Sequence, residues 1–294
     1  MITYNTKDWL TFIFRFHKSD TVRQLWKLMI FIALYSWAVA FFVLDIRHLS
    51  NDSHLKNLTL LHNLLGFVLS FLLVFRNNSA YDRWWEGRKL WGSLVNNSRN
   101  LALKINAILP DSQHQADRHF FAIAIPMYAK RLSLHLKTEQ TRLALDEQPH
   151  PELAGIDLNK HVPNQVAGLL YKRVQHLYKN KQITDAQLLF INNELQSFTD
   201  ICGACERIKN TPIPFSYSSF LKKFVFIYIM TLPFGFVFSL GFYVIPVVTF
   251  IFYVLTSLEL IAEEIEDPFG EDVNDLPTEK MAENIKKQVH EILQ

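Results

Sequence analysis

The apolar residues of the chain gather in three long stretches that carry no charge. These stretches are Leu28–Leu44, Leu58–Phe75 and Phe224–Leu258. A helix rises ~1.5 Å per residue and needs about 20 apolar residues to cross a hydrocarbon layer of ~30 Å. The first two stretches are therefore predicted to be membrane-spanning helices, and the short polar segment 46–57 connects them.

The third uncharged stretch is too long for a single crossing. It contains Pro233, Gly235, Gly241 and Pro246 near its middle, and these residues break or bend helices. Two short crossings at about 217–237 and 241–262, joined by a tight turn, fit this pattern. A single kinked helix is the alternative, but it would overshoot the bilayer.

The second stretch has an internal pattern that an ordinary lipid-facing helix does not need. Its large apolar residues share one helical stripe, whereas polar and small residues, among them His62, Asn63, Gly66 and Ser70, lie off the stripe or at its margins. Small and polar residues allow helices to pack closely and to bond to one another in a membrane. This favours a helix in the wall of a pore, with the apolar stripe as a constriction. An ordinary membrane helix with a few tolerated polar residues is the alternative.

The remaining chain is polar and shows helical rather than strand periodicity. Leu94, Leu101, Ile105 and Ile108 recur at three and four residues, and residues 185–208 show the same pattern behind a Thr184 cap. Proline and polar residues mark 137–163 as a loop. The predicted helices of the aqueous part are 92–109, 116–136, 166–178, 185–208 and 277–292.

Charge placement predicts the orientation. Basic residues and tryptophans occupy 1–27 and 76–91, and Lys222 and Lys223 precede the third stretch. Cytoplasmic flanks of membrane helices are enriched in Lys and Arg. Both termini and the helical domain are therefore predicted to lie in the cytoplasm, and the membrane is predicted to be the inner membrane of a bacterium. Segment 1–27 reads either as a helix on the membrane surface or as a soluble packed helix.

Composition excludes several classes of function. The net charge is only +2, so no nucleic-acid partner is predicted. No catalytic signature is present, and we predict that the protein is not an enzyme.

Cys202 and Cys205 have the spacing of a redox pair but lie in a helical pattern with no preceding strand, which favours a structural role. His62 is either functional or a buried histidine bonded to backbone.

Three motifs together resemble those of the bestrophin family of ion channels. They are FRNNSAYDRWWEGRKLW at 75–91, TPIPFSYSSFLKKF at 211–224 and EEIEDPFGEDVNDLP at 263–277. Their order, their spacing and the predicted four crossings agree with the family over nearly the whole chain. The resemblance implies an all-α integral membrane protein, a homopentamer with one central pore and a helical cytosolic domain.

The resemblance also implies two constrictions. A hydrophobic neck would be formed by Leu60, Leu64 and Val68, with Phe67 and Phe71 as competitors for the same register. A second aperture in the cytosolic part would fall near Gln187 or Leu188. A glutamine at this place departs from the apolar residue of the family.

The acidic run after the last crossing corresponds to the calcium clasp of animal family members. The matching carboxylates are Asp267, Asp272 and Asp275, whereas Val273 and Asn274 replace two others. Calcium prefers several oxygen ligands, so the losses argue against calcium gating, and a solvated acidic turn is the alternative. No other cofactor is predicted.

The sequence thus predicts a pentameric channel that passes small monovalent ions through a hydrophobic neck, in contact with membrane lipids. The resemblance implies chloride conduction in animal members, and sodium permeation has been considered for the prokaryotic branch. A secondary transporter and a membrane-anchored scaffold are the alternatives. The predicted parts are 1–27, an interfacial segment; 28–76, two crossings; 77–214, the cytosolic domain; 215–262, two crossings; and 263–294, the acidic turn and last helix.

Overall fold

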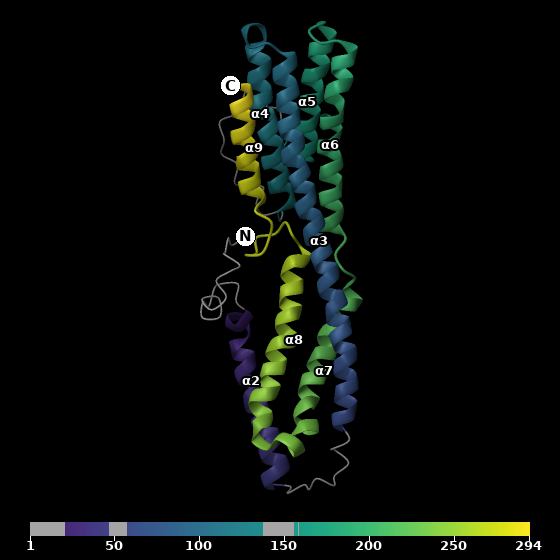
Figure 1. The fold of residues 1–294 in the computed structure, drawn as a ribbon, viewed down its shortest axis with the longest axis vertical. Helices are drawn as coiled ribbons and strands as arrows, with labels where there is room; N and C mark the ends of the chain where they lie inside the picture. Colours follow the sequence, from purple (N-terminus) through teal and green to yellow (C-terminus); the bar gives the residue numbers. More distant parts are fainter. Residues whose placement is uncertain (1–20, 47–57, 138–155, 158) are drawn as a thin grey trace. The chain divides into compact units, whose positions relative to one another are not determined.

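The structure is a computed structural model that describes residues 21–46, 58–137, 156–157 and 159–294. Every regular element among these residues is helical (Figure 1). The chain divides into two compact units. The first comprises residues up to Arg83 together with Pro212–Glu266, and the second comprises Trp84–Thr211 together with Asp267–Gln294.

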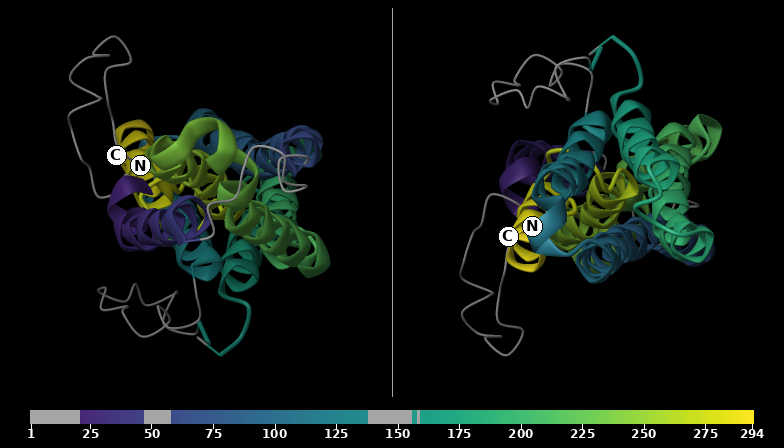
Figure 2. Two further views of the ribbon diagram at one scale, coloured as in Figure 1. Left: turned by 90° about the horizontal axis from the view of Figure 1, so that it is seen from below. Right: turned by 90° about the horizontal axis from the view of Figure 1, so that it is seen from above.

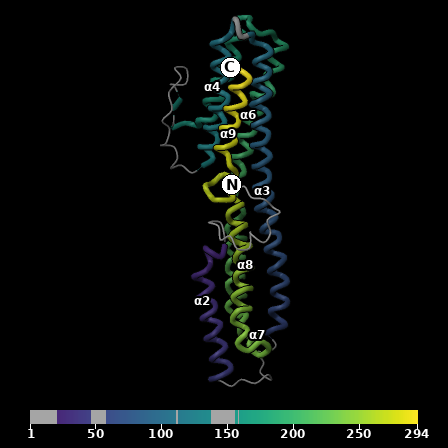
Figure 3. Tube along the Cα trace, turned by 60° about the vertical axis from the view of Figure 1, so that its left-hand side comes forward, coloured from purple at the N-terminus to yellow at the C-terminus, as the bar shows by residue number. Residues whose placement is uncertain are grey.

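The first unit is built from long apolar helices. They are α2 (Thr21–Phe41), which continues into a π-helical turn at Phe42–Ile46, the first part of α3 (Leu58–Ile108), α7 (Phe215–Leu240) and α8 (Val244–Glu266). Helix α8 packs against both α2 and α7 (Figure 3). Helix α2 begins before the predicted Leu28 because residues 21–27 contain no helix breaker. The rest of the predicted surface segment 1–27, residues 1–20, lies outside the described residues.

Among the residues that the structure describes, three helical stretches are long and apolar enough to cross a membrane. They are Thr21–Ile46, Leu58–Ile108 and Phe215–Glu266. The third is not a single rod: it turns at Gly241, whose backbone has φ +55°, and α7 then packs on α8. Glycine adopts this left-handed conformation without steric cost. The predicted fold-back is therefore confirmed, although the turn follows Leu240 and Pro233 lies inside α7.

Helix α3 is the main departure from the predicted elements. It runs unbroken for 51 residues, where the sequence suggested one helix to Phe75 and another from 92. The intervening residues are polar but contain no proline, and polarity alone does not interrupt backbone hydrogen bonding. Asn77 even bonds back to the carbonyl of Leu73 at 2.9 Å. Residues of α3 up to Arg83 belong to the first unit, and those from Trp84 belong to the second.

The second unit is a helical bundle (right panel of Figure 2), and it has its own apolar core. Besides the end of α3 it contains α4 (Asp111–Leu136), α5 (Val162–Lys179), α6 (Asp185–Asn210) and α9 (Thr278–Leu293). Helix α4 contacts α5, α6 and α9. The periodic residues singled out in the sequence point inward as predicted, and the buried ones are Leu94, Leu101, Ile105, Ile191, Leu195, Phe198 and Ile201.

The predicted loop 137–163 ends slightly earlier than expected. Helix α5 begins at Val162 because the His161 side chain caps it, accepting a hydrogen bond from the Asn164 backbone N–H at 3.1 Å. Pro163 then occupies the first turn, where its missing N–H costs nothing. Helix α4 likewise begins at Asp111, directly after Pro110.

Candidate functional site

The predicted neck residues all lie on one exposed face of α3. Leu60 is 77% exposed, Leu64 62% and Phe67 63%. Val68 and Phe71 are also exposed. Positions spaced by four, seven, eight and eleven residues share one side of a helix, so these side chains form a single apolar stripe, hereafter the α3 stripe. An uncovered apolar surface of this size in one chain marks contact with lipid or with other protein chains.

The opposite face of α3 is held by the other helices of the first unit. His62, Leu69, Leu73 and Ala80 are buried on it. The Nδ1 of His62 lies 2.6 Å from the Leu58 carbonyl oxygen and can only donate to it, and its Nε2 lies 3.0 Å from Thr231 Oγ1. This is the buried, backbone-bonded histidine that the sequence left as one of two interpretations.

Small residues let α3 approach α7 closely. A Cβ at Gly66 would lie 2.7 Å from the Tyr228 hydroxyl, and one at Gly235 would lie 2.9 Å from His62 Nδ1. Thr59 also donates a hydrogen bond to the Gly235 carbonyl at 2.6 Å. The polar margin of α3, with Asn63 and Ser70, borders a cleft of about 320 Å³. Of the small and polar residues noted in the sequence, His62 and Gly66 therefore serve contacts within one chain.

A buried ion cluster joins α3 to α8, and the sequence did not reveal it. Arg76 is 1% exposed, and its Nη2 lies 2.7 Å from Glu266 Oε2 while its Nε lies 3.6 Å from Glu259 Oε1. Glu266 also accepts a hydrogen bond from the backbone N–H of Ile213 at 2.7 Å. The sequence pattern indicates Arg76 only as an interfacial cation, because its partners Glu259 and Glu266 are nearly two hundred residues away along the chain.

The acidic turn after α8 is organised mainly by backbone contacts. Asp275 is buried, and its carboxylate accepts the Asp272 backbone N–H at 2.6 Å. Asp267 accepts the Phe269 N–H at 3.3 Å. The Trp84 indole donates to the carbonyl of Asn274 at 3.0 Å. Calcium binding by these carboxylates stays a prediction.

The predicted cytosolic aperture lies at the first turn of α6. Gln187 completes a capping box: its Oε1 accepts the Thr184 N–H at 2.9 Å, and its own N–H donates to the Thr184 hydroxyl. Leu188 is partly buried against the core of the second unit. The exposed apolar side chains at this end of α6 are Leu189 and Phe190 of the following turn, which the sequence did not single out. A role of this turn as an aperture remains a prediction.

The cysteine pair is buried on the inner face of α6. Cys202 and Cys205 are both free thiols. Burial, assisted by the nearby Glu206 carboxylate, raises the pKa of Cys202 to about 12, and burial also raises the pKa of Cys205. Since the thiolate is the reactive form, this environment agrees with the structural role expected from the sequence.

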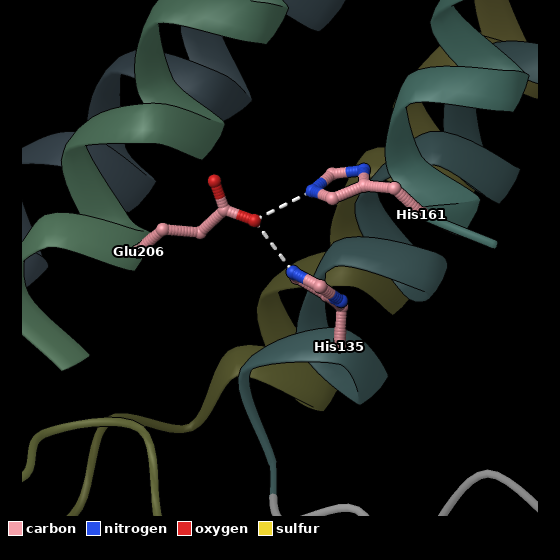
Figure 4. Close-up of side chains that lie close together, drawn as sticks. All are labelled: His135, His161 and Glu206. Atoms are coloured by element: carbon pink, nitrogen blue, oxygen red, sulfur yellow. Dashed lines mark hydrogen bonds and ion pairs between the residues drawn. The ribbon is translucent and has the colours of Figure 1, made fainter. Parts of the chain in front are cut away.

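One set of side chains in the described part of the chain converges as metal ligands do. His135, His161 and Glu206 bring one ligand atom each within 4.8 Å of one another (Figure 4). They come from the end of α4, the cap of α5 and the last turns of α6. No sequence motif indicates this trio, because the three residues are far apart along the chain.

The fold and these features define an all-helical membrane protein with an uncovered apolar face on its longest helix. Residues 1–291 match the family model described as bacterial and fungal bestrophin proteins. The chain belongs to the bestrophin family, as the sequence motifs indicated.

Relatives of known name and structure agree with this assignment. The chain is 36% identical over 233 residues to a voltage-dependent anion channel-forming protein of Nostoc, covering 77% of this chain and 75% of the relative. It is 30% identical to one of Escherichia coli K12, covering 97% and 92%. A crystal structure of a mutant bestrophin homologue from Klebsiella pneumoniae superposes with a TM-score of 0.81 at 26% identity, covering 91% and 98%. These names describe channel-forming proteins and no enzyme.

Proposed function

We propose that this protein is a homopentameric anion channel whose pore neck is formed by the α3 stripe. The observation that carries the proposal is the stripe itself. Five large apolar side chains stand exposed along one face of α3, while its opposite face is packed against its own chain. Copies of this face around a symmetry axis would enclose a narrow apolar conduit.

The preference for anions comes from the relatives. The proteins of Nostoc and Escherichia coli are named for anion channel formation, and no relative named above supports the sodium permeation considered from the sequence. The nearly neutral stripe fixes no sign of charge by itself. Selectivity would then depend on the charged residues and dipoles along the conduit.

The proposed gate is a dewetting constriction. Rings of Leu60, Leu64 and Val68 would offer no hydrogen bonds to water or to a passing ion. A narrow apolar ring excludes water until its walls move apart, and ions then pass with part of their hydration. Phe67 and Phe71 flank these rings and border the same conduit, with their ring centroids 5.2 Å apart in one chain.

The proposed topology has four crossings. Helices α2, the first half of α3, α7 and α8 would each span the membrane, and the chain would fold back at Gly241 between α7 and α8. Both termini would then lie in the cytoplasm, in accord with the basic residues of 76–91 and 222–223.

Currents in planar bilayers test the function. The purified chain should give discrete single-channel steps, and in asymmetric sodium chloride the reversal potential should lie near that of chloride. A reversal potential near that of sodium would contradict the anion assignment. Slow, saturable uptake without steps would point to a transporter, and no flux from a properly assembled protein would point to a scaffold.

A further inference from the structure

Three polar side chains of the second unit converge on a single point that the channel function does not use. Both imidazoles approach the same carboxylate oxygen: His135 Nε2 and His161 Nε2 each lie 2.6 Å from Glu206 Oε1. Figure 4 shows the two rings turned toward Glu206 from different helices. The ring centroids are 4.5 Å apart and the planes are tilted by 55°, so the rings do not stack face to face. The candidate ligand atoms of the three side chains lie within 4.8 Å of one another.

We propose that His135, His161 and Glu206 bind one divalent transition-metal ion, with zinc as the best fit. Two imidazole nitrogens and one carboxylate oxygen form a ligand set that zinc uses in proteins, and a water molecule completes the tetrahedron. Imidazole favours zinc, copper and nickel, whereas calcium and magnesium prefer all-oxygen sites.

The charge and exposure of the trio suit an incoming cation. With both imidazoles neutral, the three side chains carry one negative charge, which a divalent ion reverses. The side chains of His135, His161 and Glu206 are 24%, 32% and 29% exposed. An ion can therefore reach the site from solvent without unfolding the bundle.

Metal binding requires two small adjustments. Ligand atoms ~2.0–2.1 Å from a tetrahedral zinc ion lie about 3.3 Å from one another, so the 2.6 Å contacts must open by side-chain rotation. His161 Nδ1 accepts the Asn164 N–H as a helix cap, but a neutral imidazole bound through Nε2 carries its proton on Nδ1. The ring would therefore release this cap, and zinc coordination must offset the loss of that one capping hydrogen bond.

The ion would connect three segments that are distant in sequence. His135 lies in the last turn of α4, His161 caps α5, and Glu206 lies on α6. Residues 138–155, between the two histidines, lie outside the described part. A metal here would fix the ends of the chain on either side of this segment, in addition to the apolar core.

The experiment measures zinc and cobalt binding to the full-length, tag-free chain in detergent after chelator treatment. We expect one zinc ion per chain, a rise in the melting temperature with zinc, and cobalt absorption typical of tetrahedral coordination. His135→Ala, His161→Ala and Glu206→Gln should each weaken zinc binding at least tenfold. His176→Ala, which removes an exposed histidine from α5, is the matched control and should bind as the wild type does.

The folding of each variant is checked separately, by circular dichroism and by the melting temperature measured after chelator treatment. His135→Asn and Glu206→Asp serve as milder variants if the first ones unfold. Equal zinc stoichiometry and affinity in the wild type and in folded ligand variants would overturn the proposal. So would a wild-type chain that binds no zinc, which would leave the trio as a hydrogen-bonded contact only.

Discussion

At the scale of single residues, the buried guanidinium of Arg76 is the most consequential charge in the first unit. It is packed between two carboxylates of α8 and has almost no access to solvent. Removing one partner of a buried ion pair leaves an uncompensated charge, which costs more than the pair itself contributes. The packing of α3 against α8 therefore depends strongly on the single side chain of Arg76.

Arg76→Met should destabilise the protein strongly, by about 3–5 kcal/mol, because Glu259 and Glu266 would lose their cation. Arg76→Lys should cost less, since it retains the charge but not the fork that reaches both carboxylates. Thermal unfolding in detergent, followed by tryptophan fluorescence, measures both changes. Lys89→Met removes an exposed charge from the same helix and serves as the control. Equal melting temperatures for Arg76→Met and Lys89→Met would contradict this account.

The buried thiols predict a pH dependence of stability. The pKa of Cys202 rises from 9.0 to about 12 because the thiol is buried near Glu206. Between these values the folded chain keeps a proton that the unfolded chain releases, so stability is fully present below about pH 9 and falls as the pH rises.

The double variant Cys202→Ala/Cys205→Ala should lose less stability than the wild type between pH 8 and 10.5. Melting temperatures across this range, recorded with a chelator present, measure the difference. Part of the fall should remain, because burial also raises the pKa of Tyr128. Parallel curves for the two proteins would show that the thiols do not contribute.

At the scale of elements, α3 combines two surfaces of different purpose. One face is fixed by His62, Leu69, Leu73 and Arg76, and the other presents the α3 stripe. The helix continues without a break into the core of the second unit, where Trp91 and Leu94 are buried.

Leu60→Ala, Leu64→Ala and Val68→Ala combined should widen the proposed neck and raise anion flux into liposomes several-fold. The triple variant Phe226→Ala, Ile227→Ala and Phe250→Ala is the matched control, because it removes exposed apolar side chains from α7 and α8. Its flux should equal that of the wild type. Unchanged flux from an assembled α3 variant would exclude this neck.

At the scale of the whole molecule, the two units use apolar residues differently. In the second unit the apolar residues form a closed core. The first unit leaves many large apolar side chains exposed on α2, α3, α7 and α8. Lipid can cover part of this surface, and the proposed assembly would cover the stripe.

The purified protein in detergent should therefore form a particle of five 34.4 kDa chains. Native mass spectrometry and light scattering with detergent correction measure this number directly. Chemical cross-linking should give a ladder that ends at five. A monomer or dimer as the largest species, in a preparation that conducts ions, would contradict the pentameric proposal.

Much of this fold follows from local sequence signals. Apolar runs set the positions of the membrane helices, three- and four-residue spacing set the bundle helices, and Thr184 marked the start of α6. The sequence predicts the helix ends less accurately than the helices themselves. The start of α5 is an example, because Pro163 is compatible both with a loop and with the first turn of a helix. The unbroken course of α3 through polar residues was missed because polarity indicates exposure and not the end of a helix.

The sequence by itself determined the helical class, the apolar stretches and the stripe on residues 60–71, since periodicity depends only on neighbours along one helix. Tertiary structure decided the partners: Arg76 with Glu259 and Glu266, His62 with Thr231, and the meeting of His135, His161 and Glu206. These contacts join residues between 26 and about 190 positions apart in the chain. Their distances depend on how whole helices pack, and no local pattern encodes that packing.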